Sequence, residues 1–94
     1  MNLDKILKEK HGTIIDVRTP EEFNAGNVKG SVNIPLHSVL KRLDEIKSLK
    51  TPLVLCCASG NRSGEAFGYL TRHGIECLNG GSWTDVNDYQ LQNS

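Results

Sequence analysis

The stretch that decides the fold reads Leu53-Val54-Leu55-Cys56-Cys57-Ala58-Ser59-Gly60-Asn61-Arg62-Ser63. Its first five residues are a nearly continuous apolar run, which is typical of a strand buried on both faces of a parallel sheet. The residues that follow are small or turn-forming, and after them Ala66, Phe67 and Leu70 have helical spacing. The stretch therefore predicts a strand, a tight polar loop and a helix in direct succession.

The same succession is predicted upstream. The short β-branched run from Thr13 to Val17 indicates a buried strand. Thr19-Pro20-Glu21-Glu22 then places an N-cap, a first-turn proline and a capping-box glutamate in order. A helix should therefore begin directly after this strand and end near Gly26.

The remaining elements are predicted from apolar spacing and from residues that start or stop helices. They are a helix over residues 3–11, a strand over 31–34, a helix over 36–49, a strand over 75–78 that ends before Gly80-Gly81, and a final helix capped by Ser82 with Asp85. Because strands alternate with helices, we expect an α/β fold with a small, mainly parallel central sheet and helices on both faces. We expect residues 1–94 to form one domain.

Composition excludes several functional classes. The 94 residues are 37% hydrophobic, enough for one compact core. Eleven basic and 11 acidic residues cancel, and without a basic stripe we expect no binding to nucleic acid or membrane. No apolar run approaches the roughly 18 residues of a membrane span, and the three cysteines form no disulfide pattern. We therefore expect a cytoplasmic protein.

Two polar turns are candidates for the functional site. In open α/β sheets, ligands bind where the carboxyl ends of strands turn into helices. The turns at those positions are Arg18-Thr19-Pro20 and the segment that follows Cys57.

The second turn carries the stronger chemistry, with Cys57 as the candidate catalytic residue. Its loop, here called the 58–63 loop, consists of Ala58, Ser59, Gly60, Asn61, Arg62 and Ser63. Small side chains let successive backbone N–H groups point inward as an anion-binding nest, and a helix N-terminus adds its dipole. With the charge of Arg62 nearby, the pKa of Cys57 should fall, so that its thiolate is the nucleophile. Attack on a sulfane sulfur would then form a persulfide held by the same loop.

A plainer interpretation is that Cys57 is a core cysteine followed by an ordinary turn, since single cysteines are commonly buried and inert. The combination of cysteine, four residues and arginine at a strand-to-helix junction is much rarer. It favours the catalytic interpretation.

These residues resemble the active-site loop of rhodanese-like domains. The segment from Ile15 to Phe23, Gly30-Ser31-Val32-Asn33-Ile34-Pro35 and Gly80-Gly81-Ser82-Trp83 resemble the other signatures of that family, in the same order. The resemblance implies a rhodanese fold and sulfur transfer by double displacement through a Cys57 persulfide. The implied donor is thiosulfate or a persulfide, and the implied acceptor is a thiol, cyanide or a protein. No cofactor is implied.

Two other functional classes stay open. One is a non-catalytic rhodanese-like module that senses sulfur or binds a protein, because a fold alone does not determine function. The other is a phosphatase or an arsenate-reductase-like enzyme. The phosphatases related to the family use a loop one residue longer, and a phosphoryl group needs that larger ring, so the four residues between Cys57 and Arg62 disfavour phosphatase chemistry.

Asp16 and Arg18 are candidate supporting residues, since they flank Val17 at the end of the first strand, on the same sheet edge as Cys57. We expect Arg18 to form an ion pair with Glu22 or Glu21, worth at most ~1 kcal/mol if exposed. Trp83 is the aromatic residue expected near the site.

We expect the other two cysteines and the histidines to have no part in catalysis or metal binding. Alternation along the strand sends the Cys56 side chain to the face opposite Cys57. Cys77 should fill the core, unless the last turn brings it to the loop as a sulfur acceptor. The histidines are scattered without metal-ligand spacing, so we expect no metal site.

Overall fold

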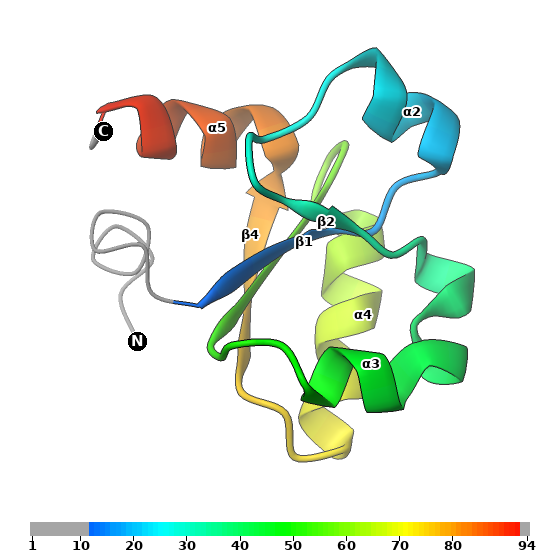
Figure 1. Ribbon diagram of the computed structural model, residues 1–94. Coiled ribbons are helices and arrows are strands. Elements are labelled where there is room, and N and C mark those ends of the chain that lie inside the picture. Colours follow the sequence, from blue (N-terminus) through cyan, green and yellow to red (C-terminus); the bar gives the residue numbers. More distant parts are fainter. Residues whose placement is uncertain (1–11, 93–94) are drawn as a thin grey trace.

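The structure is a computed structural model that describes residues 12–92 (Figure 1). The helix predicted over residues 3–11 lies outside the described residues. The described chain contains a four-stranded sheet in the order β2-β1-β3-β4, and every neighbouring pair is parallel. The strands are β1 (Thr13–Asp16), β2 (Val32–Asn33), β3 (Leu53–Cys57) and β4 (Cys77–Ser82). The expected α/β architecture is confirmed.

Helices cover both faces of this sheet, as predicted. They are α2 (Pro20–Ala25), α3 (Leu43–Lys47), α4 (Asn61–Arg72) and α5 (Trp83–Gln92), with two 3₁₀ turns, η1 (Leu36–Ser38) and η2 (Leu40–Arg42). Figure 1 shows α3 and α4 on one side of the sheet and α5 on the other.

Strand β3 lies at the centre of the core, and all five of its residues are buried. Leu55 and Cys57 face the α4 side, where they join the cluster that contains Leu70. Cys56 faces the other side and packs in a cluster with Val86 of α5. The apolar run is buried on both faces because each face meets its own helix layer.

The start of α2 agrees with the sequence prediction in detail. Thr19 is the N-cap, its hydroxyl accepts a bond from the backbone N–H of Glu22, and the Glu22 carboxylate accepts one from the backbone N–H of Thr19. This reciprocal pair is a capping box with proline at the first position. It starts the helix directly after the carboxyl end of β1.

The prediction of one helix over residues 36–49 was wrong. The segment forms η1, η2 and the short α3 instead. Bonds from the Ser38 N–H to the Pro35 carbonyl and from the Val39 N–H to the Leu36 carbonyl span three residues, the pattern of a 3₁₀ helix. The apolar residues at 40, 43, 46 and 49 recur every third position, a spacing that suits 3.0 residues per turn as well as 3.6.

The prediction that the last strand ends before Gly80 was also wrong, because β4 continues through both glycines to Ser82. Its register against β3 shifts between Leu55 and Cys56, whose partners are Asn79 and Gly81, so Gly80 is the extra residue of a β-bulge. A β-carbon at Gly80 would lie 2.9 Å from Val86 Cγ2 and 3.0 Å from Val54 Cγ1. Close packing therefore requires glycine at position 80, and this glycine is part of strand β4 and does not end it.

The topology brings the two candidate turns together. The chain leaves β1 toward β2 and leaves β3 toward β4, in opposite directions along the sheet, while β1 and β3 are neighbours. Asp16 pairs with Cys56, and the Val17 N–H donates to the Cys56 carbonyl at 2.9 Å. The carboxyl ends of these strands form a topological switch point, the usual position of a ligand site in such sheets. None of the helices within residues 12–92 is long and apolar enough to cross a membrane.

Candidate active site

Cys57 is the last residue of β3 and is 0% exposed. Its Sγ atom accepts hydrogen bonds from the backbone N–H of Gly60 at 3.0 Å and of Ser63 at 3.4 Å. The Ser63 hydroxyl lies 3.4 Å from the same sulfur. The 58–63 loop therefore surrounds the sulfur with donors, as the anion-binding nest predicted from the sequence requires.

The loop can close in this way because residue 60 is glycine. Gly60 precedes α4 with a φ of +97°, a conformation that side chains with a β-carbon rarely adopt. A β-carbon there would also lie 3.4 Å from the Cα of Gly81 in β4. The turn aims the Gly60 N–H at the sulfur and lets the loop pack against the bulged strand.

Hydrogen bonding sets the acidity of Cys57. Burial raises the pKa of its thiol, but bonds from the Ser63 hydroxyl and from the backbone N–H groups of Ser63, Ser59 and Gly60 lower it by more, so that the pKa falls below its ordinary value. Burial raises the pKa of Cys56 to about 12 and also raises that of Cys77. Among the three thiols, Cys57 is the one prepared to ionise.

The Ser63 hydroxyl connects Cys57 to β4. It donates to the Asn79 Oδ1 atom at 2.6 Å, and the same oxygen accepts from the Gly81 N–H at 3.0 Å. The Asn79 amide also donates to the Gly60 carbonyl at 3.2 Å. While the Ser63 hydroxyl donates to Asn79, a protonated Cys57 thiol can donate to the Ser63 oxygen. Once Cys57 ionises, the hydroxyl can turn and donate to the thiolate. The Asn79 oxygen then still accepts from the Gly81 N–H.

We expect Ser63→Ala to raise the pKa of Cys57, because the thiolate loses a hydrogen-bond donor. A bond to a charged group contributes about 1.5–3 kcal/mol, so alkylation by iodoacetamide at pH 7 should become about tenfold slower. The measurement is the alkylation rate against pH, whose midpoint should move upward. Ser59→Ala is the matched control, because it removes an exposed hydroxyl of the same loop and keeps the backbone N–H. An unchanged midpoint in Ser63→Ala would refute this role of the hydroxyl.

Arg62 lies on the loop but pairs with Glu22, which was assigned from the sequence to the capping box and to an ion pair with Arg18. Its two terminal nitrogens donate to the Glu22 carboxylate oxygens at 2.7 and 3.0 Å. This bidentate pair joins the two candidate turns, which lie 40 residues apart in the chain. The Glu22 bonds are the largest cause of the raised pKa of Arg62, and attraction to Cys57 contributes less. The donors that lower the pKa of Cys57 are those of Ser63, Ser59 and Gly60, so the nest predicted from the sequence accounts for the shift and Arg62 is not among its causes.

The ion pair predicted for Arg18 was wrong. Arg18 Nη2 lies 2.7 Å from Asp16 Oδ2, and Arg18 Nε lies 3.0 Å from both Asp16 oxygens. The remaining Arg18 donors bond to the carbonyls of Glu22 and Gly26. Asp16 is 0% and Arg18 4% exposed, so the pair is buried and not a surface bridge. Trp83 stacks on the guanidinium, with 4.7 Å from its carbon to the ring centroid, which places this aromatic beside the site as expected.

Cys77 lies away from Cys57. It pairs with Leu53 at the amino end of β3, whereas Cys57 pairs with Ser82 at the carboxyl end, so four residues at about 3.3 Å each separate the two positions along the strand. Cys77 is 6% exposed and lies in the core cluster. The arrangement supports its assignment as a core residue and does not bring it to the loop.

Sequence reasoning missed two residues of the site, Glu22 as the partner of Arg62 and Asn79 as the partner of Ser63. Glu22 was expected to cap α2 and was a candidate partner of Arg18, and nothing local in the sequence pointed to Arg62, 40 residues away. Asn79 is a polar residue in a predicted loop, whereas the structure extends β4 through it and pairs it with Leu55, on the face toward α4. Within residues 12–92, no group of three or more His, Cys, Asp or Glu side chains is arranged to hold a metal ion.

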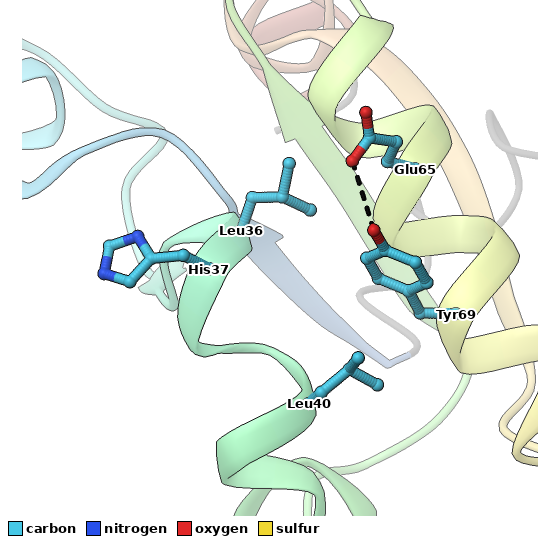
Figure 2. A pocket seen from close by; sticks show the side chains of 5 residues that line it. All are labelled: Leu36, His37, Leu40, Glu65 and Tyr69. Atoms are coloured by element: carbon cyan, nitrogen blue, oxygen red, sulfur yellow. Dashed lines mark hydrogen bonds between the residues drawn. The ribbon is translucent and has the colours of Figure 1, made fainter.

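A separate pocket of about 490 Å³ lies between the two 3₁₀ turns and α4 (Figure 2). It is lined by Leu36, His37, Leu40, Glu65 and Tyr69. The Tyr69 hydroxyl donates to Glu65 at 3.3 Å, and Figure 2 shows both groups on the α4 wall opposite the leucines. No residue of the 58–63 loop lines it.

Comparison with known proteins gives consistent matches. The family model for the rhodanese-like domain matches residues 2–86. The chain is 35% identical over 78 residues to the thiosulfate sulfurtransferase GlpE of Pseudomonas aeruginosa, covering 80% of this chain and 70% of that protein. A structure described as rhodanese with anions from E. coli is 32% identical, with a TM-score of 0.70 over 78% of this chain and 88% of that one.

A further relative is the uncharacterized protein YqhL of Bacillus subtilis, with 43% identity over 61 residues that make up 65% of this chain. The match covers 48% of YqhL, so the chain spans about half the length of that relative.

Proposed function

Because the chain belongs to the rhodanese-like domain family, we propose that it is a sulfurtransferase that carries sulfur as a persulfide on Cys57. The observation that carries this proposal is that two backbone N–H groups donate to the Cys57 sulfur within 3.4 Å, with the Ser63 hydroxyl at 3.4 Å and able to turn to a thiolate. These donors stabilise a thiolate before transfer and an anionic persulfide after it. The 58–63 loop is the proposed binding site for the transferred sulfur, and the buried Asp16–Arg18 pair supports it from β1.

The proposed reaction is a double displacement. The Cys57 thiolate attacks the outer sulfur of thiosulfate, a new S–S bond forms on Cys57, and sulfite leaves with the electron pair of the broken S–S bond. An acceptor thiolate or cyanide then attacks the outer sulfur of the persulfide, and Cys57 leaves as the thiolate. Atoms and electrons balance without a cofactor.

The persulfide also resolves a geometric difficulty, which is that Cys57 is 0% exposed. An S–S bond is about 2.05 Å long, so the transferred sulfur lies about 2 Å from Sγ. The next two residues of the chain, Ala58 and Ser59, are exposed. An acceptor needs to reach only the outer sulfur, which a small thiol, cyanide or the cysteine of a partner protein can do.

The alternative is a non-catalytic module that senses sulfur or binds a protein. The full burial of Cys57 is the observation that favours it, because a buried thiol exchanges slowly with bulky partners. Turnover separates the two functions. With thiosulfate or a persulfide as donor and cyanide as acceptor, an enzyme forms thiocyanate in many equivalents per protein chain, whereas a sensor stops at one.

Phosphatase chemistry has less support. Four residues separate Cys57 from Arg62, so the loop forms a smaller ring than a phosphoryl group needs. Glu22 also neutralises Arg62, whereas a phosphoryl group needs a positive charge at its site. Hydrolysis of a phosphate ester that is lost in Cys57→Ser would contradict this assignment.

A further inference from the structure

The charges beside Cys57 are balanced in pairs. Arg62 of the loop forms a bidentate pair with Glu22 at 2.7 and 3.0 Å, and Arg18 at the neighbouring strand end forms a buried pair with Asp16. Arg18 is also enclosed by the Gly26 carbonyl and the Trp83 ring. Each cation near the loop is therefore already matched by a carboxylate, and the donors that face the sulfur are backbone N–H groups and a hydroxyl.

Glu22 is the carboxylate that touches the loop. The Glu22 side chain is 36% exposed, and the Arg62 side chain is 34% exposed. Bonds from Arg62 are the largest cause that lowers the pKa of Glu22, bonds from Thr19 add to them, and the pKa is about 2. Glu22 is therefore negatively charged at neutral pH. It accepts from Arg62 and Thr19 together, so it links the start of α2 to the start of α4.

This pairing acts differently on donors of different charge. Thiosulfate is a dianion whose sulfonate oxygens need a cation or several donors, and here the nearest guanidinium is neutralised by a fixed negative charge. The hydropersulfide group of R–S–SH carries at most one charge and has no sulfonate. Because Coulomb energy scales with the product of the charges, neutralising Arg62 removes about twice as much attraction from the dianion as from a monoanion at the same distance.

We propose that Glu22, by holding Arg62, sets the donor class of this protein and favours hydropersulfides over doubly charged donors such as thiosulfate. The inference rests on the proposed sulfurtransferase function. In the favoured step, the Cys57 thiolate attacks the outer sulfur of R–S–SH, the donor S–S bond breaks, and R–S⁻ leaves with its electron pair. The product is Cys57–S–SH, and the total charge is unchanged. Glu22 is a positioning residue here, because it acts through Arg62.

The test is Glu22→Gln. Glutamine satisfies a capping box as glutamate does, so α2 keeps its start while the charge and the bidentate grip on Arg62 are lost. Glu21→Gln is the matched control, because Glu21 is exposed on the same turn of α2 and takes no part in the Arg62 pair. The measurement is the single-turnover rate of one-sulfur adduct formation, by quenching and intact-protein mass spectrometry, with thiosulfate and with 2-hydroxyethyl hydropersulfide.

In Glu22→Gln we expect the ratio of the thiosulfate rate to the hydropersulfide rate to rise at least about tenfold, because the freed Arg62 can bind the sulfonate. In Glu21→Gln the ratio should stay at the wild-type value. A ratio that does not change in Glu22→Gln, or rates that change equally for both donors, would show that Glu22 is only structural and would overturn the inference. If neither donor forms the adduct on the wild type, the proposed function itself fails, and this inference fails with it.

Discussion

Replacing Cys57 with serine should lower the rate of thiocyanate formation at least about 10⁴-fold, since loss of the nucleophile removes the covalent path entirely. Serine fits the space of the thiol, and the Gly60 and Ser63 N–H groups that bond Sγ keep an acceptor. A hydroxyl is not ionised at neutral pH, so it does not accept sulfane sulfur. The measurement is steady-state turnover with cyanide as acceptor and each of the two donors in turn.

Cys77→Ala is the control for this experiment. Cys77 is also a buried thiol of the same core cluster, but it lies at the opposite end of the strand pair and its pKa is raised. Its replacement should leave turnover within about twofold of the wild type, although stability falls with the lost packing. If turnover survives in Cys57→Ser, or disappears in Cys77→Ala while the fold persists, Cys57 is not the residue that carries the sulfur.

Asp16→Ala should lower the free energy of unfolding by about 3–5 kcal/mol, because it leaves Arg18 buried without its counter-charge. Asp16 supplies both carboxylate oxygens to Arg18, and one of them also accepts from the Arg18 backbone N–H at 3.0 Å. The two remaining carbonyl acceptors of Arg18 carry no full charge. Urea unfolding followed by circular dichroism measures the change.

Asp44→Ala is the matched control for Asp16→Ala, because Asp44 is an exposed aspartate in α3. Its loss should change the unfolding free energy by no more than about 0.5 kcal/mol. Asp16→Asn keeps the shape of the side chain, so it should give a folded protein with a smaller loss. If Asp16→Ala is as stable as Asp44→Ala, the buried pair does not hold the carboxyl end of β1 in place.

The parts of the site that the sequence predicted are local in the chain. Cys57, Gly60 and Ser63 lie within one strand-to-helix turn, and the requirements of an anion-binding nest follow from their order alone. The capping box of α2 was predictable for the same reason, since Thr19 and Glu22 are three residues apart. In both cases local geometry leaves few alternatives.

The parts that the sequence did not predict depend on contacts between distant segments. Arg62 and Glu22 are 40 residues apart, and Ser63 and Asn79 are 16 apart. Arg18 was expected to pair with Glu22 or Glu21. It precedes the N-cap of α2, where the backbone is extended, and its partner is Asp16. The 3₁₀ turns after Pro35 were hidden because an apolar residue at every third position fits both helix types.

The central claim is that Cys57 carries the transferred sulfur, and intact-protein mass spectrometry tests it most directly. After incubation with 2-hydroxyethyl hydropersulfide and removal of excess donor, the wild-type chain should gain the mass of one sulfur atom. Peptide mapping should place that atom on Cys57, and cyanide should remove it. A chain that gains no sulfur, or whose added sulfur persists in Cys57→Ser, would contradict the account.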